Sequence, residues 1–507
     1  ACEAGSGLRD DNEAQGHAYS PSASHWFHGK KGSTRRSCDP AAGSLAIHND
    51  VMAAEEGRWV DQARRLAELG FPVTVVEVGM VMMSVTDTMM VGHLSEVALG
   101  AVALGHSFSW VFICFGCGTL SVLDPIFSQA FGAGDKRALA AGLQRGVIMA
   151  VVLAVPVVVA MCCAGPALAA LGQPTELIGI ASQYSTVCSF SVVPFLMFSL
   201  LRQLLQGIGK AGPIVTASVV ANVANVVLNH TFINGCAALG IPQLGAIGSA
   251  YATVASRWFL LGSVLWASCG TLGQILEHSS PKDLRNFAPL AKMAALGLPM
   301  GLQQFFEWAS FSCLAILMGR LGTVAVAGFQ VASGLTDVTY MVPLGISAAT
   351  SVLVGQAVGR GQIKDADLVC RVAMVATLGF TTLCGLAFCL FPEAIARQWC
   401  SSGPVVAIAV RTLPMVGAFQ ILDGCLAIVV AALRGAGRTN WAFFSSAAGF
   451  WLVGLPSSVL LAFNVGMGPA GLWLGMSLGL ACSTAMCLAG VIPILAGTHA
   501  GRRMALS

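Results

Sequence analysis

Long apolar segments, separated by short polar stretches, follow one another along most of the chain. About twenty helical residues, at roughly 1.5 Å per residue, cross the hydrocarbon core of a bilayer. We expect twelve segments of at least this length to form one membrane-spanning helix each. They lie at about 69–92, 104–131, 144–170, 179–205, 212–234, 244–268, 290–319, 325–357, 367–391, 404–433, 441–464 and 469–496.

Composition supports an all-α membrane protein. The 507 residues are 56% hydrophobic and only 10% charged, with a mean hydropathy of +0.76, whereas soluble chains are about a quarter charged. A net charge of +3 gives no reason to expect nucleic acid as a partner. The 17 cysteines are scattered through apolar segments, so we expect neither a disulfide framework nor a metal or cofactor site.

The two ends differ in kind from the middle. Residues 1–65 are rich in Gly, Ser, His and charge, which predicts a polar, disordered N-terminal tail without a signal peptide. Residues 66–290 then hold the first six spans and 291–496 the last six, and 497–507 form a short tail. Loops that contain lysine and arginine alternate with loops that contain few of them, and basic residues also flank both ends of the apolar region. This alternation predicts that both termini are cytoplasmic.

The second half of the chain repeats the first. Pro72 and Pro299, Gln129 and Gln356, and Gly132 and Gly359 stand 227 positions apart, and SQAFGAGDKRAL is answered by GQAVGRGQIKDA. Because each half has an even number of spans, both halves enter the membrane from the same face. The pattern predicts two six-helix lobes related by a pseudo-two-fold axis along the membrane normal, with a site between them reached alternately from either side.

Glu307 lies near the middle of the seventh apolar segment. A charge at this depth is costly and usually marks a binding site, an ion path or a proton relay. A carboxyl group in a low-dielectric cavity favours its neutral form, so it can bind and release a proton near physiological pH. Amphiphilic cations need apolar and aromatic walls, for which the neighbouring candidates are Phe305, Phe306, Trp308, Phe329 and Met415.

Several segments together resemble the multidrug and toxic compound extrusion (MATE) transporters over about 66–495. They are TDTMMVGHL, LDPIFSQAFGAGDKRALAAGLQRG, QLLQGIGKAGP, YMVPLGISAATSVLVGQAVGRG and LRGAGRTN. The resemblance is closest to the NorM-like branch, with some features of eukaryotic members. It implies a secondary antiporter that exports organic cations and other amphiphiles in exchange for H⁺ or Na⁺, with no other cofactor.

The resemblance also implies the coupling residues. Asp87 matches the acid of the first helix, and Asn225 and Asn229 match its polar partners, one helical turn apart. Glu307 matches the acid of the seventh helix and Asp423 that of the tenth. Phe419, four residues before Asp423, stands where some NorM-type proteins carry a Tyr, and we expect it in the substrate cavity.

Each candidate also has a structural interpretation. Glu307 could pair with Arg257 in the sixth span, and Asn225 and Asn229 could simply hydrogen-bond neighbouring helices. The structural alternative also applies to Asp87 and Asp423. Three further intramembrane acids have no assigned role, and we expect local pairing for each: Glu77, Asp124 and Asp337.

Two other functions remain open. A lipid-linked oligosaccharide flippase could share the two-lobe fold but would need a strongly cationic cavity. A membrane enzyme would need clustered catalytic or metal-binding groups, whereas the histidines are isolated. We expect a monomer that takes small amphiphilic or cationic substrates within the lipid bilayer. The membrane is expected to be a plasma or inner membrane, or a vacuolar one if the source is eukaryotic.

Overall fold

The computed structural model describes residues 40–92, 94–236, 240–280, 287–399 and 402–495, and these are almost entirely helical. A single isolated β-bridge joins Cys236 and Ile241 within this part of the chain. The helices of the first half are α1 (Pro40–Gly92), α2 (Glu96–Leu120), α3 (Leu123–Ala133), α4 (Lys136–Cys162), α5 (Ala164–Ala170), α6 (Thr175–Ser189), α7 (Val192–Gly207), α8 (Gly212–Asn234) and α9 (Ala246–Leu276).

The second half follows the same order of long helices. Its elements are α11 (Ala288–Arg320), α12 (Thr323–Gly359), α13 (Ile363–Leu390), α14 (Pro392–Trp399), α15 (Gly403–Gly435), α16 (Thr439–Ala447), η2 (Ala448–Gly454), α17 (Leu455–Val459), η3 (Leu460–Asn464) and α18 (Pro469–Leu495). The run from α16 to η3 forms one continuous span, in which short π-helical stretches interrupt the α-helix.

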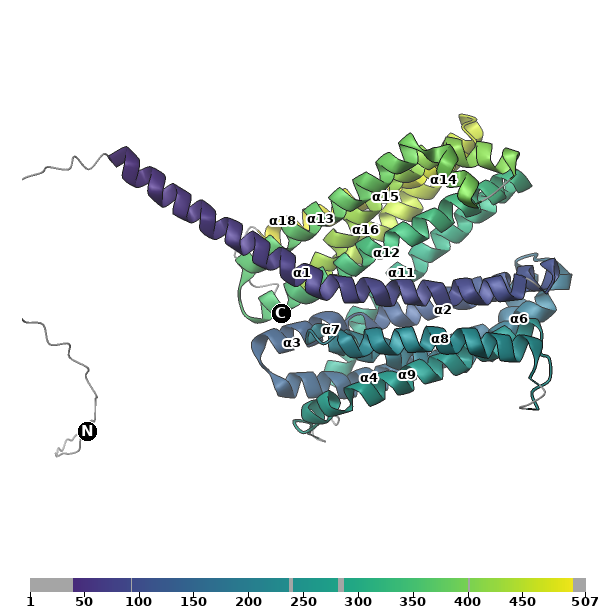
Figure 1. Cartoon of the computed structure of the whole chain (residues 1–507), viewed down its shortest axis with the longest axis horizontal. Coiled ribbons are helices and arrows are strands. Elements are labelled where there is room, and N and C mark those ends of the chain that lie inside the picture. The colour runs from purple at the N-terminus through teal and green to yellow at the C-terminus, as the bar shows by residue number, and fades with distance from the viewer. Residues whose placement is uncertain (1–39, 93, 237–239, 281–286, 400–401, 496–507) are drawn as a thin grey trace, which may run out of the picture. The chain divides into compact units, whose positions relative to one another are not determined.

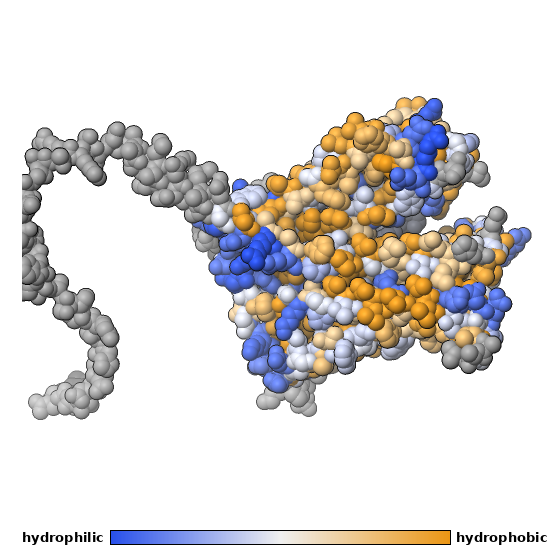
Figure 2. All heavy atoms as spheres, viewed as in Figure 1, coloured by the Kyte–Doolittle hydropathy of each residue, from blue (hydrophilic) through white to orange (hydrophobic). Residues whose placement is uncertain are grey.

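Twelve membrane-crossing elements lie where the apolar segments predicted them. Ten helices in the described residues are long and apolar enough to span, and α6 with α7 makes an eleventh span bent by 51°. The twelfth is α11, a 33-residue helix that is less apolar because it carries Glu307 and neighbouring glutamines. Figure 2 shows hydrophobic residues over the middle of the molecule and hydrophilic ones toward its two ends, as a bilayer requires.

The described residues from Glu56 onward form one compact unit of two helical lobes. One hydrophobic core lies among α2 to α9 and the other among α12 to α18. Between the lobes, α2 packs on α11 and α3 packs on α12. By the 227-residue offset α3 is the counterpart of the end of α12, so equivalent segments of the repeat meet there. The two bundles meet near α3 and are apart at the other end, where Figure 2 shows the surface hollowed between them (Figure 1). The all-α, two-lobe fold is therefore confirmed.

Two glutamines join the lobes where the bundles meet, an end we call the basic end because Lys136, Lys210, Arg360 and Arg438 lie there. The Nε2 of Gln129 on α3 donates to the carbonyl of Gly435 at 2.9 Å. Reciprocally, the Nε2 of Gln356 on α12 donates to the carbonyl of Gly207 at 2.8 Å. Both acceptors are among the last carbonyls of a helix, which have no intrahelical partner. Each lobe thus caps a helix of the other, and the basic end is closed.

Glycines permit this contact. A Cβ atom at Gly132 would overlap the carbonyl of Gln356, and one at Gly359 would overlap the carbonyl of Gln129. Since the two backbones cross at this point, only a residue without a side chain fits. The 227-residue repeat therefore preserves a glutamine and a glycine in each half for one reciprocal joint.

The N-terminal boundary differs from the expectation. Residues 1–39 and 496–507 lie outside the described residues, but α1 begins at Pro40, so 40–65 are helical rather than disordered. A helix satisfies its backbone hydrogen bonds internally, so polar residues can extend the first span without a core of their own. Arg58 on this extension forms an ion pair with Asp365 of α13 at 2.8 Å, across the basic end.

We expect Gly132→Ala to destabilise the protein, because the added methyl group forces α3 and α12 apart where their backbones cross. Overpacking of this kind costs about 1–3 kcal/mol and should lower the melting temperature of the purified protein in detergent. The two inter-lobe hydrogen bonds should weaken as the helices separate.

Gly273→Ala on α9 is the matched control, because a Cβ there meets no atom within 4 Å. Alanine favours a helix over glycine, so this variant should melt at or slightly above the wild-type temperature. A Gly132→Ala protein as stable as the wild type would show that the crossing is looser than the structure indicates.

Candidate functional site

The two acids of the second lobe lie on neighbouring helices. Glu307 is partly buried in the middle of α11, and Asp423 is 9% exposed on α15. They lie within electrostatic range of each other, and Glu307 is also within range of Arg434 at the end of α15. Within the described residues neither carboxylate forms an ion pair, and no side-chain hydrogen bond holds either one. Two adjacent carboxylates in a membrane interior hold one shared cation far more readily than none.

Close packing of α15 against α13 holds the helix that carries Asp423 in place. The following residue, Gly424, faces α13, where an added Cβ would press on the methyl groups of Thr377 and Thr381 at 2.9 Å. Two turns earlier on α15, Gly417 lies against Gly385 of α13. These contacts hold α15 tightly on α13 through its glycines. Asp423 is therefore on a rigid helix, as a binding group should be.

The acid of the first lobe is held differently. Asp87 on α1 is 4% exposed and accepts hydrogen bonds from the amides of Asn225 at 3.2 Å and Asn229 at 2.6 Å, both on α8. Thr253 on α9 donates its hydroxyl to the other carboxylate oxygen at 2.7 Å. Three helices thus converge on one carboxylate, and the predicted set of Asp87, Asn225 and Asn229 is one cluster.

Sequence reasoning missed Thr253. A signal was present, because Ser249 and Thr253 repeat on α9 the four-residue polar spacing of Asn225 and Asn229 on α8. The side-chain oxygens of Asn225, Asn229 and Ser249 are buried without a hydrogen-bond partner. Carboxylate, amide and hydroxyl oxygens are the ligands that hard cations prefer. The cluster therefore has the donor atoms to hold Na⁺, and its carboxylate can hold a proton.

Aromatic side chains meet where α2 faces α11. Trp110 lies edge-on to Trp308 with centroids 6.5 Å apart, and Phe112 lies 6.2 Å from Phe305. Phe306 continues the group toward Trp451, at 5.6 Å. Trp308 is 41% exposed. Phe305, Phe306 and Trp308 therefore lie at the seam between the lobes, as a substrate wall would.

A family model described as MatE matches residues 72–231 and 299–460, which together make up more than half of the chain and correspond to the two repeats. The chain belongs to the MATE family. The NorM-like resemblance is also confirmed, since the chain is 32% identical to a probable multidrug resistance protein NorM from Bradyrhizobium diazoefficiens, over 84% of this chain and 92% of that protein. It is 29% identical to the multidrug resistance protein MdtK of Photorhabdus laumondii, over 85% and 95%.

Solved MATE structures share the fold. The eukaryotic MATE transporter AtDTX14 superimposes with a TM-score of 0.79 at 23% identity, covering 88% of this chain and 98% of its own. The Vibrio cholerae MATE transporter VcmN in its bent form gives 0.74 at 21% identity, covering 87% and 98%. This MATE chain is accordingly a membrane transporter of the multidrug-extrusion type.

Two expected cavity residues of the MATE chain lie in its core. Phe329 is 6% exposed and Phe419 is fully buried, and both pack on Trp473 of α18, with centroids 5.5 and 5.4 Å away. The faces of α12 and α15 that carry them turn toward α18 rather than toward α2, so neither ring walls a cleft in this structure. Met415 also packs partly against this core.

The remaining intramembrane charges differ from one another. Glu77 forms an ion pair with Arg202 of α7, so the expected local pairing applies to it. Asp124 is partly buried within electrostatic range of Arg202 and Arg434, and Asp337 is exposed on α12. The alternative in which Arg257 pairs with Glu307 is wrong for this structure, because Arg257 donates to Ser191 at 2.8 Å instead.

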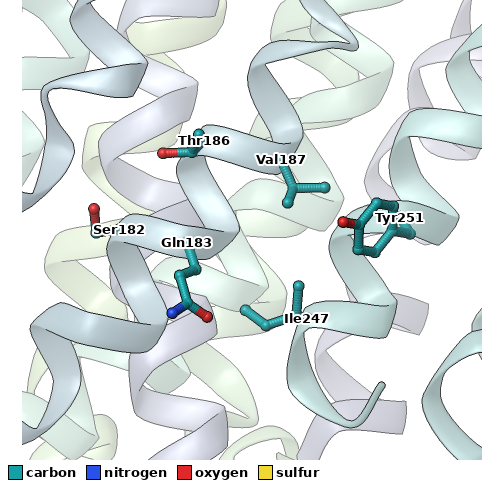
Figure 3. Close-up of a pocket in the computed structure, with 6 residues that line it drawn as sticks. All are labelled: Ser182, Gln183, Thr186, Val187, Ile247 and Tyr251. Atoms are coloured by element: carbon teal, nitrogen blue, oxygen red, sulfur yellow. The ribbon is translucent and has the colours of Figure 1, made fainter. Parts of the chain in front are cut away.

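A pocket of about 320 Å³ lies between α6 and α9, outside the predicted site. Figure 3 shows Gln183 and Val187 on one helix facing Ile247 and Tyr251 on the other. None of its lining residues belongs to the acid clusters. Within the described residues, no group of three or more His, Cys, Asp or Glu side chains is placed to bind a metal.

We expect Thr253→Val to destabilise the protein by about 1.5–3 kcal/mol, because it removes a hydrogen bond to a buried carboxylate while keeping the side-chain shape. The melting temperature in detergent measures the effect.

Thr377→Val is the matched control, because the Thr377 hydroxyl is buried without a partner in the described structure. Replacing an unpaired buried hydroxyl with a methyl group should be neutral or stabilising. Equal losses in the two variants would mean that Thr253 contributes only through packing.

Proposed function

We propose that this MATE transporter exports amphiphilic organic cations, such as drugs or metabolites, in exchange for H⁺ or Na⁺. The relatives named as multidrug resistance proteins support a drug-like substrate. Glu307 and Asp423 are the proposed coupling pair of the second lobe, and Asp87, Asn225 and Asn229 form the cation site of the first. Phe305, Phe306 and Trp308 are the proposed substrate wall.

The observation that supports the proposal is that Glu307 and Asp423 lie within electrostatic range of each other and that neither forms an ion pair among the described residues. Two negative charges that form no ion pair are costly in a low-dielectric interior, so they bind either the driving ion or a substrate cation. When the driving ion neutralises the pair, the substrate loses its electrostatic partner and leaves. Antiport requires this mutual exclusion.

Alternating access follows from the two-lobe geometry. In this structure the lobes are joined at the basic end by Gln129 and Gln356 and are apart at the opposite end. The distribution of Lys and Arg assigns the basic end to the cytoplasm, together with both termini. The structure then corresponds to a form closed to the cytoplasm, and rocking of the lobes would open that side. We propose that one chain in a plasma or inner membrane suffices.

The flippase alternative has less support. A site for lipid pyrophosphate would need several unpaired cations, whereas Arg202 is paired with Glu77 and Arg257 is the one buried cation in the described structure. Membership of the MATE family also favours a transporter over a membrane enzyme.

We expect Glu307→Gln and Asp423→Asn each to abolish gradient-driven export, because neither amide can exchange a proton or hold a cation by charge. The measurement is ethidium efflux from proteoliposomes under a pH gradient or a Na⁺ gradient. The gradient that drives the wild-type protein identifies the coupling ion.

Glu393→Gln on α14 is the control, since Glu393 pairs with Arg397 on an exposed helix, and it should export normally. Melting temperatures of all variants establish that they fold. If both second-lobe variants still concentrate ethidium, the coupling site is not at Glu307 and Asp423.

A further inference from the structure

Arg257 is a buried cation that the proposed coupling sites do not use. It lies on α9 with 7% of its surface exposed. Its Nη1 donates to the hydroxyl of Ser191 at 2.8 Å, and that hydroxyl donates to the carbonyl of Cys188 at 2.6 Å. The guanidinium lies over the ring of Phe195, 4.5 Å from its centroid. The hydroxyl and the ring fix its orientation.

These contacts leave most of the guanidinium unused. Ser191 and Phe195 are its only direct partners in the described structure, and no carboxylate lies within ion-pair distance. None of its nitrogen atoms is both sealed from solvent and unpaired. Arginine offers five N–H donors in a planar fork that fits a carboxylate or similar anion. An oriented, charged fork with free donors is therefore available to a ligand.

Asp87 is the acid that would be expected to pair with Arg257, but its carboxylate does not bind the guanidinium. Its carboxylate already accepts from Asn225, Asn229 and Thr253, and it acts on Arg257 only at longer range. An isolated charge within the membrane is costly, so such residues usually mark a functional site. Arg202, a partly buried arginine of this lobe, is by contrast paired with Glu77.

Aromatic rings connect Arg257 to the seam between the lobes. Phe195, under the guanidinium, lies 6.1 Å from Trp110, which faces Trp308 of the other lobe. Trp110 also stacks on His106, with centroids 5.9 Å apart. An aromatic ligand entering at Trp308 would find ring faces along the way and a cation at the end.

We propose that Arg257 and its adjoining aromatic side chains form an anion-binding subsite of the first lobe, which takes the carboxylate or sulfonate of an aromatic amphiphile. The subsite extends the proposed function, because it adds aromatic anions and zwitterions to a substrate range that the acids restrict to cations. Binding at this subsite does not depend on how export is coupled.

The test is binding of two matched probes, naphthoate and naphthylmethylammonium, to the full-length protein in detergent, followed by tryptophan fluorescence. Arg257→Gln should weaken naphthoate binding about tenfold or more, as expected for loss of a charge-assisted hydrogen bond, and leave the cationic probe unaffected. Arg257→Lys keeps the charge but loses the planar fork, so it should give an intermediate affinity for naphthoate.

Equal affinity of wild type and Arg257→Gln for naphthoate would overturn the proposal. Equal weakening of both probes would also overturn it, because it would show that Arg257 only supports the fold. If Arg257→Gln does not fold, the lysine variant decides between these outcomes by its selective loss of naphthoate affinity. Ethidium export by the same variants is a separate readout, so failure of the cation-export proposal would not be confused with failure of this one.

Discussion

The membrane interior cannot solvate a charge, and this constraint separates the polar residues of the protein into two groups. Some are neutralised within the fold, such as Glu77 by its ion pair with Arg202. Others, namely Glu307, Asp423 and Arg257, have no ionic partner in the described structure. Because an unpaired charge at this depth is costly, the second group is where ligands and ions are expected to bind.

The two halves of the repeat share the residues that pack the lobes together and differ in the charged residues proposed to bind ions and substrates. Gln129 and Gln356 cap each other's lobes, and Gly132 and Gly359 let the backbones cross. A two-fold joint of this kind requires the same residue types in both halves, so it preserves the repeat. A transporter also needs a joint that can open, and hydrogen bonds to the ends of helices can be exchanged for water at little cost.

The sequence was sufficient for the twelve spans and the two lobes, because these depend on hydrophobic length and on the internal repeat. The cluster of Asp87 with Asn225 and Asn229 followed from the resemblance to MATE transporters, since helical spacing alone shows only that the two asparagines share a face. It was insufficient where a helix face had to be assigned. Phe419 belongs to an apolar helix that is buried nearly all round, so periodicity does not show that its ring turns toward Trp473. Residues 40–65 are polar, and from this composition we expect a disordered tail. They are helical in the structure, because a polar segment can extend an existing helix without a hydrophobic core of its own.

The divergence between halves places an acid in one lobe where the other lobe carries an aromatic ring. Near the ends of α7 and α15 the repeat offset is 228, as in Gly207 and Gly435, and by this offset Phe195 corresponds to Asp423. The position that carries an unpaired acid in one lobe thus carries, in the other, the ring over which Arg257 lies. Duplication supplied two equivalent positions, of which one now carries an acid and the other a ring that supports a neighbouring arginine. A cleft with an acid on one wall and an arginine on the other can orient an amphiphile that carries both charges.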